Sequence, residues 1–177
     1  RSDILNASVN GRERVVALCD VDFSGSAKDS VASFPKAKLF ADYRKMLEEM
    51  KDIDAVTIST PDHVHGPAAK FCMERGKHVY VQKPMTHNIR EARMLTQMAR
   101  DKKVVTQMGN QGASNDGTRI LKEWHEADLI GDVHTIYAWT DRPVWPQGIP
   151  WSTAKPEVPK ELDWDLWLGT APYKNYV

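Results

Sequence analysis

Four short apolar runs recur along the chain and restrict its fold more than any other feature. Each run is continuously apolar rather than alternating, as in strands that are buried on both faces of a parallel sheet. Segments with helical spacing separate the runs, and this alternation predicts βαβ units with right-handed crossovers. The sequence therefore predicts an α/β fold with a doubly wound parallel sheet. The runs lie at residues 15–18, 55–58, 79–81 and 104–106.

Helix signals fill the intervals between these runs. Asp42 is a favourable N-cap, and Asn88 and Glu91 have the spacing of a capping box. Gly76 is placed to end one of the helices, and a fourth helix runs toward Gly131. The side chains expected to face inward are Tyr43, Met46, Leu47 and Met50, then Val64, Ala68, Phe71 and Cys72, then Ile89, Ala92, Leu95 and Ala99, and finally Ile120, Leu121 and Trp124.

The pattern changes after Gly131. Residues 133–140 alternate weakly in polarity and predict a half-exposed strand. Residues 143–159 contain five prolines, which disfavour regular structure, and residues 163–169 predict a short helix that ends at a glycine. We predict two domains, one at residues 1–115 and the start of another at residues 116–177.

Composition argues against several kinds of ligand. The 177-residue chain has 24 basic and 24 acidic side chains, so no basic field attracts nucleic acid or an anionic membrane. No apolar run has the length of a membrane span. Cys19 and Cys72 lie in apolar segments and are interpreted as core residues. His63 and His65 do not share a helical face, so no metal pair is expected.

Both ends of the sequence interrupt a pattern. The chain begins at Arg1 without an initiator methionine and stops at Val177 shortly after a new segment begins. We therefore expect a fragment that is truncated at both ends. Any export signal would precede Arg1, so the sequence leaves the cellular location open.

A lysine follows the third apolar run, in the tripeptide Gln82-Lys83-Pro84. The carboxyl edge of a parallel sheet is where open α/β folds bind ligands. A lysine at this edge can hold a substrate hydroxyl or share its proton. The alternative interpretation is a surface lysine in an ordinary strand-to-helix turn.

An aspartate, Asp20, follows the first apolar run directly. In a dinucleotide-binding fold, an acidic residue at this strand end accepts hydrogen bonds from the adenosine ribose, roughly 20 residues after a glycine-rich turn. Such a glycine turn would lie just before Arg1, and residues 1–10 would complete its helix. The alternative role of Asp20, capping the following turn, has comparable weight.

Two further polar turns follow the second and fourth runs. Pro61 and Asp62, after Thr60, suit the start of a helix, where free backbone N–H groups favour anions. His63 and His65, in the same turn, are as compatible with a structural or surface role as with a functional one. The sequence Asn110-Gln111-Gly112 forms the other turn, although such turns are common.

Taken together, these residues resemble the Gfo/Idh/MocA family, named after glucose–fructose oxidoreductase and inositol dehydrogenase. The resemblance spans nearly the whole chain, and its most specific element is the Lys-Pro pair. The segments that carry it are residues 17–22, 60–65, 76–84, 110–112 and 129–133.

The resemblance implies a Rossmann domain that binds NAD(P), followed by the start of an α+β substrate and dimerisation domain. It implies hydride transfer between a nicotinamide and a hydroxyl-bearing carbon of a sugar, glycoside or cyclitol, in a full-length homo-oligomer. Asp20 favours NAD over NADP, since an acidic side chain repels a 2′-phosphate. By this resemblance, Asp20 would bind the adenosine ribose, and Thr60, Pro61 and His65 would border the nicotinamide. Gln82 and Lys83 would also contact the cofactor. Lys83, Asn110 and Gln111 would contact the reacting substrate.

Two departures from the family pattern carry consequences. Most relatives have glutamate where this chain has Gln82, and neutral Gln82 stabilises the lysine ammonium less. Relatives also supply an aspartate–histidine pair as proton acceptor, from a region that lies beyond Val177, so we expect the chain alone to be inactive.

Two alternative functions remain open. Some relatives cleave a glycosidic bond by transient NAD-dependent oxidation without net redox change. A non-catalytic dinucleotide-binding protein is the other alternative.

Overall fold

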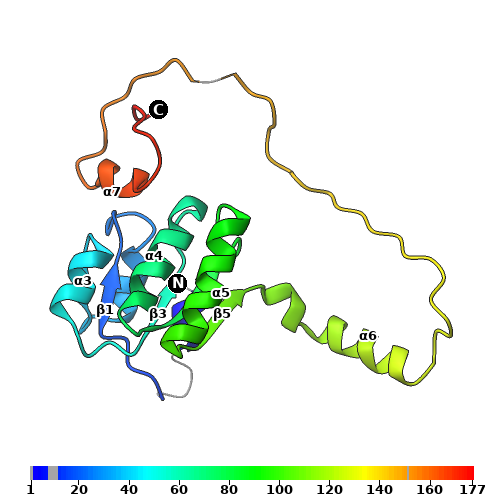
Figure 1. Cartoon of the computed structure of the whole chain (residues 1–177). Helices are drawn as coiled ribbons and strands as arrows, with labels where there is room; N and C mark the ends of the chain where they lie inside the picture. The colour runs from blue at the N-terminus through cyan, green and yellow to red at the C-terminus, as the bar shows by residue number, and fades with distance from the viewer. Residues whose placement is uncertain (1, 8–11, 151) are drawn as a thin grey trace. The chain divides into compact units, whose positions relative to one another are not determined.

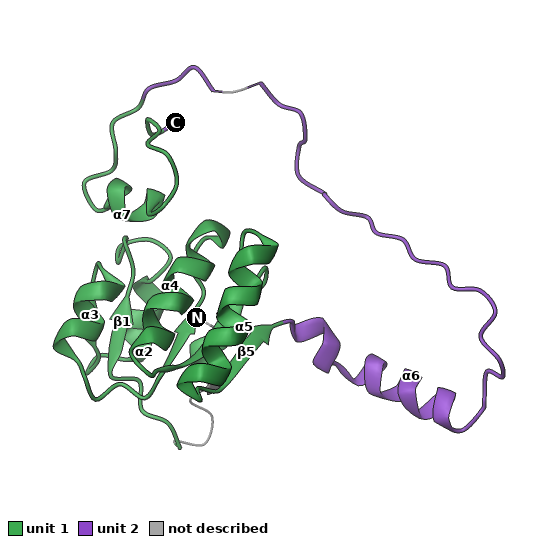
Figure 2. Cartoon of the chain, viewed as in Figure 1, with its two compact units in different colours: residues 1–109, 156–176 green, residues 110–155, 177 purple. Residues whose placement is uncertain are grey.

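A computed structural model of the chain describes residues 2–7, 12–150 and 152–177. The chain forms two compact units (Figure 2). The first comprises residues 1–109 and 156–176, and the second comprises residues 110–155 and 177. The predicted boundary near residue 115 remains a prediction about the whole protein.

The first unit is built on two parallel sheets. Strand β1 (Ala17–Cys19) pairs with β2 (Lys38–Phe40), and β4 (His78–Gln82) lies between β3 (Ala55–Ile58) and β5 (Thr106–Gly109). All of these pairings are parallel, as the continuous apolar runs predict. The strand β2 was not anticipated from the sequence, and β5 begins two residues after the start of the run that predicted it.

The strand order matches that of a dinucleotide-binding fold. In the order 3-2-1-4-5-6 of that fold, the pair β2-β1 corresponds to strands 3-2 and the trio β3-β4-β5 to strands 4-5-6. The position of strand 1 falls between β1 and β3, and no strand of the described residues occupies it. The α/β class predicted from the sequence is confirmed.

Helices and their caps connect the strands. The side chains of Asp42 and Asn88 accept backbone N–H groups at the starts of α3 (Tyr43–Glu49) and α5 (Ile89–Lys102), as predicted. Glu91 completes the box differently, because its carboxylate accepts the N–H of His87. The other helices among the described residues of this unit are α1 (Ser2–Ala7), α2 (Lys28–Ser33), the 3-10 helix η2 (Asp62–Val64), α4 (His65–Glu74) and α7 (Trp164–Leu168).

The core lies between the sheets and helices α3, α4 and α5 (Figure 1), and α4 packs against both α5 and β4. Parallel strands need cover on their faces, and the amphipathic helices supply it. The predicted inward stripes of α3 and α4 are confirmed, whereas Ile89 of α5 is 73% exposed because it lies in the first turn, beyond the packed part of the helix. Buried core residues include Met46, Leu47, Val64, Ala68, Cys72 and Leu95.

The second unit contains the 3-10 helix η3 (Gln111–Ser114) and α6 (Asp116–Glu126), followed by coil. The helix is where it was predicted, but its apolar side chains Ile120, Leu121 and Trp124 are exposed. The strand predicted at residues 133–140 is wrong, since this segment is coil. A strand requires a neighbouring strand to satisfy its backbone groups, and none of the described residues pairs with this one.

Candidate active site

The predicted site residues of the first unit follow three parallel strands, β1, β3 and β4. Asp20 follows β1, Thr60 and Pro61 lie after β3, and Lys83 follows β4. Because the carboxyl ends of parallel strands face one way, these residues belong to the carboxyl edges of the two sheets. A cavity of about 1080 Å³ extends along β1 and β3, where Leu18 and Ile58 line it, and reaches Asp20, Thr60 and Pro61 at the carboxyl ends of these strands. His65, Gln82 and Lys83 lie outside its lining.

Asp20 extends the β1–β2 ladder by one residue, because its N–H donates to the carbonyl oxygen of Phe40 at 3.1 Å. Its Oδ1 accepts the N–H of Asp22 at 3.0 Å, which is the turn contact expected under the alternative interpretation. A carboxylate has further acceptor positions, so this contact leaves capacity for ribose hydroxyls. Burial raises the pKa of the half-buried Asp20 carboxyl, and the Asp22 N–H only partly offsets this effect.

His65, the first residue of α4, is 1% exposed and reaches two turns at once. Its Nδ1 lies 2.6 Å from the carbonyl oxygen of Pro84, and its Nε2 lies 2.8 Å from that of Thr60. The imidazole therefore ties the turn that carries Lys83 to the turn that carries Thr60. This geometry gives His65 a positioning role, and the expected contact with the nicotinamide stays a prediction.

Gln82 is held at the end of β4 by two hydrogen bonds. Its Oε1 accepts the N–H of Lys83 at 3.0 Å, and its Nε2 donates to Oδ2 of Asp3 at 2.9 Å. The same Asp3 oxygen accepts the hydroxyl of Ser59 at 2.7 Å. A carboxylate from α1 therefore lies beside the position where the family pattern places a glutamate. Sequence reasoning missed Asp3, whose only local signal is its place in the first turn of α1.

Lys83 is exposed, and its peptide bond to Pro84 is cis. The neighbouring strand end approaches closely: a Cβ on Gly109 would lie 2.9 Å from the Tyr80 hydroxyl and 3.0 Å from Cδ of Gln82. Only glycine avoids this contact, so Gly109 permits β5 to pair beside Gln82. The turn of Lys83 is therefore held by close packing from β5 as well as by His65.

The region that carries these strand ends matches a known protein family. Residues 3–110 match the family described as "Oxidoreductase family, NAD-binding Rossmann fold" (Gfo/Idh/MocA). The chain belongs to the Gfo/Idh/MocA oxidoreductase family. The strand ends that carry Asp20, Thr60, Pro61 and Lys83 all lie within the matched NAD-binding region.

Three relatives illustrate the family. Levoglucosan dehydrogenase of Pseudarthrobacter phenanthrenivorans is 27% identical over 52% of this chain and 24% of the enzyme. A glycosyl hydrolase family 109 protein of Streptomyces niveus is 32% identical over 68% of this chain and 26% of that protein. The crystal structure of the WlbA (WbpB) dehydrogenase from Thermus thermophilus in complex with NAD and alpha-ketoglutarate superposes with a TM-score of 0.62 and 20% identity, covering 71% of this chain and 42% of that one. The chain thus spans between 24% and 42% of the length of these Gfo/Idh/MocA relatives.

Asn110 and Gln111 belong to the second unit. Asn110 precedes η3, which begins at Gln111, and both residues are exposed. Their contact with a substrate of the Gfo/Idh/MocA site stays a prediction.

The remaining titratable and apolar features of this member of the Gfo/Idh/MocA family concern metals, thiols and membrane spans. Within the described ranges, no three histidine, cysteine or acidic side chains come together as a metal site. Burial is the main cause that raises the pKa of both Cys19 and Cys72 to about 12, so both thiols stay protonated and unreactive at neutral pH. No helix among the described residues has the length and apolarity to cross a membrane.

Proposed function

We propose that the protein is an NAD-dependent oxidoreductase that transfers a hydride between the nicotinamide and a hydroxyl-bearing carbon of a sugar, glycoside or cyclitol. The observation that carries the proposal is the placement of Asp20, Thr60 and Lys83 at the carboxyl ends of parallel strands, within the family's NAD-binding region. Levoglucosan dehydrogenase, a relative named for a sugar-derived substrate, supports this substrate class.

The residues present fit a dinucleotide. The cavity of about 1080 Å³ slightly exceeds the usual range of about 300–1,000 Å³ for small-molecule sites, because it also extends along β1 and β3. Asp20 supplies a carboxylate for the ribose hydroxyls at one part of its wall, and Thr60 and Pro61 border another part. NAD bound there would supply the hydride acceptor, and the acidic Asp20 would disfavour a 2′-phosphate.

Lys83 is assigned to the substrate side of the same strand edge. An ammonium group donates hydrogen bonds to a substrate hydroxyl and stabilises negative charge on its oxygen as the proton leaves. His65 holds the Lys83-Pro84 turn against the Thr60 turn, which fixes the lysine relative to the cofactor side. We further propose that the full-length protein is a homo-oligomer.

Titration of NADH and NADPH, followed by nucleotide fluorescence, tests the cofactor assignment. We expect tighter binding of NADH, and tighter binding of NADPH would contradict the role of Asp20. Asp20→Ala should weaken NADH binding and reduce the discrimination between the two nucleotides.

Turnover of the full-length protein tests Lys83. Lys83→Ala should lower kcat by about two or more orders of magnitude while NADH affinity stays nearly unchanged. Lys36→Ala, at an exposed lysine in the turn before β2, is the matched control and should leave both quantities at the wild-type value. Equal activity of Lys83→Ala and wild type would refute the assignment.

The similarity to a glycosyl hydrolase family 109 protein favours a second candidate, glycoside cleavage through transient oxidation with no net redox change. Product assays with a glycoside distinguish the two functions. Free sugar without net NADH supports cleavage, whereas stoichiometric NADH supports a dehydrogenase.

A further inference from the structure

A segment distant in sequence contacts the turns that carry the proposed cofactor residues. Residues 156–176 belong to the first unit although residues 110–155, most of the second unit, precede them in the chain. Helix α7 lies beyond the carboxyl end of β1 (Figure 1). We refer to residues 162–170, which contain α7, as the strap.

Both ends of the strap are bonded to a strand-end turn. The N–H of Asp163 donates to the carbonyl oxygen of Val21 at 3.1 Å, one residue after Asp20. At the other end, Nε2 of His63 lies 2.9 Å from the carbonyl oxygen of Trp167, and the two rings are 5.2 Å apart. The strap therefore joins the turn after β1 to the 3-10 helix after β3.

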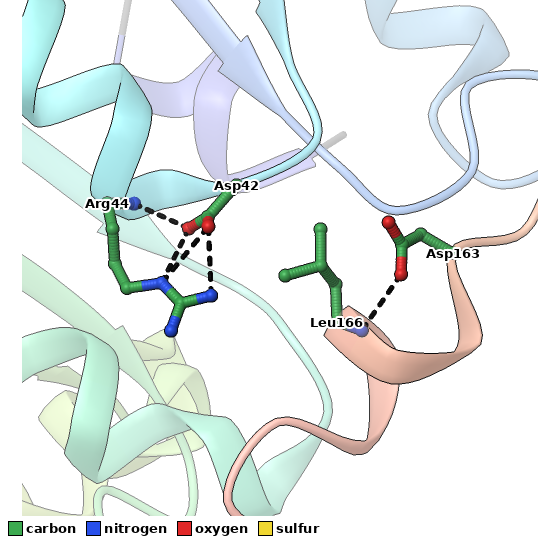
Figure 3. Close-up of polar contacts among 4 residues, drawn as sticks. All are labelled: Asp42, Arg44, Asp163 and Leu166. Atoms are coloured by element: carbon green, nitrogen blue, oxygen red, sulfur yellow. Dashed lines mark hydrogen bonds and ion pairs between the residues drawn. The ribbon is translucent and has the colours of Figure 1, made fainter.

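The strap also lies beside Asp42, Arg44 and Val64 of the first unit. Asp163 caps α7 by accepting the N–H of Leu166, and the nearby Arg44 is paired with Asp42 (Figure 3). Asp42 is the main cause of the raised pKa of Arg44, and the charge of Asp165 in the strap acts in the same direction. Gly169 has a φ of +54°, and a Cβ there would lie 3.4 Å from Cγ2 of Val64.

The strap also lines the cavity of the proposed cofactor site. Leu162, Leu166 and Trp167 line the same cavity as Asp20 and Thr60. The neighbouring Trp164 is not part of this lining; its ring stacks on Trp167 at 4.8 Å and its Nε1 donates to the carbonyl oxygen of Lys174. The two tryptophans of α7 therefore have different environments.

We propose that the strap forms a wall of the adenosine half of the dinucleotide site. The backbone of Asp163 and of Trp167 joins the turns of Asp20 and Thr60, and the Trp167 ring packs on His63 and faces the cavity. The inference rests on the proposed NAD-dependent function. The adenosine half is assigned because the strap bonds to Val21, beside the proposed ribose acceptor Asp20.

The test compares Trp167→Ala with Trp164→Ala. Both variants lose the same ring stacking, but only Trp167→Ala also removes a ring from His63 and from the cavity wall. Binding of NADH, of ADP-ribose, which contains the adenosine half, and of reduced nicotinamide mononucleotide, which lacks it, is measured by calorimetry.

We expect Trp167→Ala to weaken binding of NADH and ADP-ribose about tenfold, the loss expected of a large aromatic wall residue, and to leave the mononucleotide unaffected. Trp164→Ala should stay within about twofold of wild type for all three. Wild-type affinity of Trp167→Ala for ADP-ribose, or equal losses in both variants, would overturn the inference.

Hydrogen exchange without nucleotide separates this inference from the proposed function. If the wild-type protein binds no NADH, the proposed function fails, but the anchoring role is still measurable. The ring of Trp167 packs on His63, and the N–H of the next residue, Val64, donates to Pro61. Faster exchange at Val64 in Trp167→Ala, and not in Trp164→Ala, supports the anchoring role. Unchanged exchange in both variants would overturn it.

Discussion

The two units of the chain treat similar apolar patterns differently. In the first, Leu47 of α3 is 0% exposed, whereas in the second Leu121 of α6 is 57% exposed and Trp139 is 87% exposed. Both helices have an apolar stripe and a side-chain N-cap. The difference is that βαβ connections place neighbouring elements over α3, while the described residues provide no cover for α6. Amphipathic spacing thus predicts a helix, but burial depends on a packing partner.

The largest expected effect is on the free energy of unfolding, and it distinguishes the packed first unit from the exposed helix of the second. Leu47→Ala should lower the free energy of unfolding by about 2–5 kcal/mol, because a fully buried side chain leaves a cavity. Leu121→Ala makes the same chemical change at an exposed position and should cost less than about 0.5 kcal/mol. Urea denaturation followed by circular dichroism measures both. Equal losses would show that α6 is packed in solution.

A second prediction concerns the hydrogen bond between Gln82 and Asp3. Gln82→Glu replaces an amide donor by a carboxylate beside another carboxylate, and should destabilise the first unit by about 1–3 kcal/mol. Gln111→Glu, at an exposed glutamine of the second unit, is the control and should have little effect. Adding Asp3→Asn to Gln82→Glu should restore most of the loss. A double-mutant cycle without coupling would contradict the contact.

Removing a helix cap should have a smaller effect on stability, and this effect should also differ between the two units. Asp42→Ala should destabilise the first unit by about 1 kcal/mol, because the cap at Arg44 is lost. Asp42→Asn retains a capping oxygen and separates this loss from that of the ion pair. Asn115→Ala removes the corresponding cap of α6. It should lower helicity without changing the unfolding midpoint of the first unit, since a short unpacked helix contributes little.

The smallest effect is a dependence on pH within the first unit. Burial raises the pKa of Asp20 in the folded state, so its ionisation disfavours folding. Asp20→Asn keeps an oxygen for the Asp22 N–H and should slightly stabilise the protein at neutral pH. The gain should disappear as the pH falls below the unfolded-state pKa of aspartate, about 3.9. Unfolding free energies at neutral and acidic pH measure it, and a gain independent of pH would point to another cause.

Local signals account for most of the fold that the sequence predicted. Strands β3 and β4, the caps Asp42 and Asn88, and the short helix at 163–169 were predicted because each depends on nearby residues. Strand β2 was missed because its first two residues, Lys38 and Leu39, are exposed and it has no continuous apolar run. The strand expected at 133–140 failed for the opposite reason, because strand formation depends on a partner and the local pattern does not report one.

For the candidate site as well, local features were predicted and distant contacts were not. The positions of Asp20, Thr60, Pro61 and Lys83 at strand ends follow from the strand pattern, whereas their roles toward cofactor and substrate remain proposals. Asp3 and the strap were not identified. Their contacts join residues 79 and 104 positions apart, and no spacing rule reaches that far.

The two hydrogen bonds of His65 also determine which segment can be exchanged between relatives as a unit. Because one buried ring joins the carbonyls of Thr60 and Pro84, residues 60–84 constitute a single transplantable block. Replacing either turn alone with that of a relative would break the hydrogen bonds of His65, whereas moving residues 60–84 together preserves them. Insertions intended to reshape the site are better tolerated outside this block.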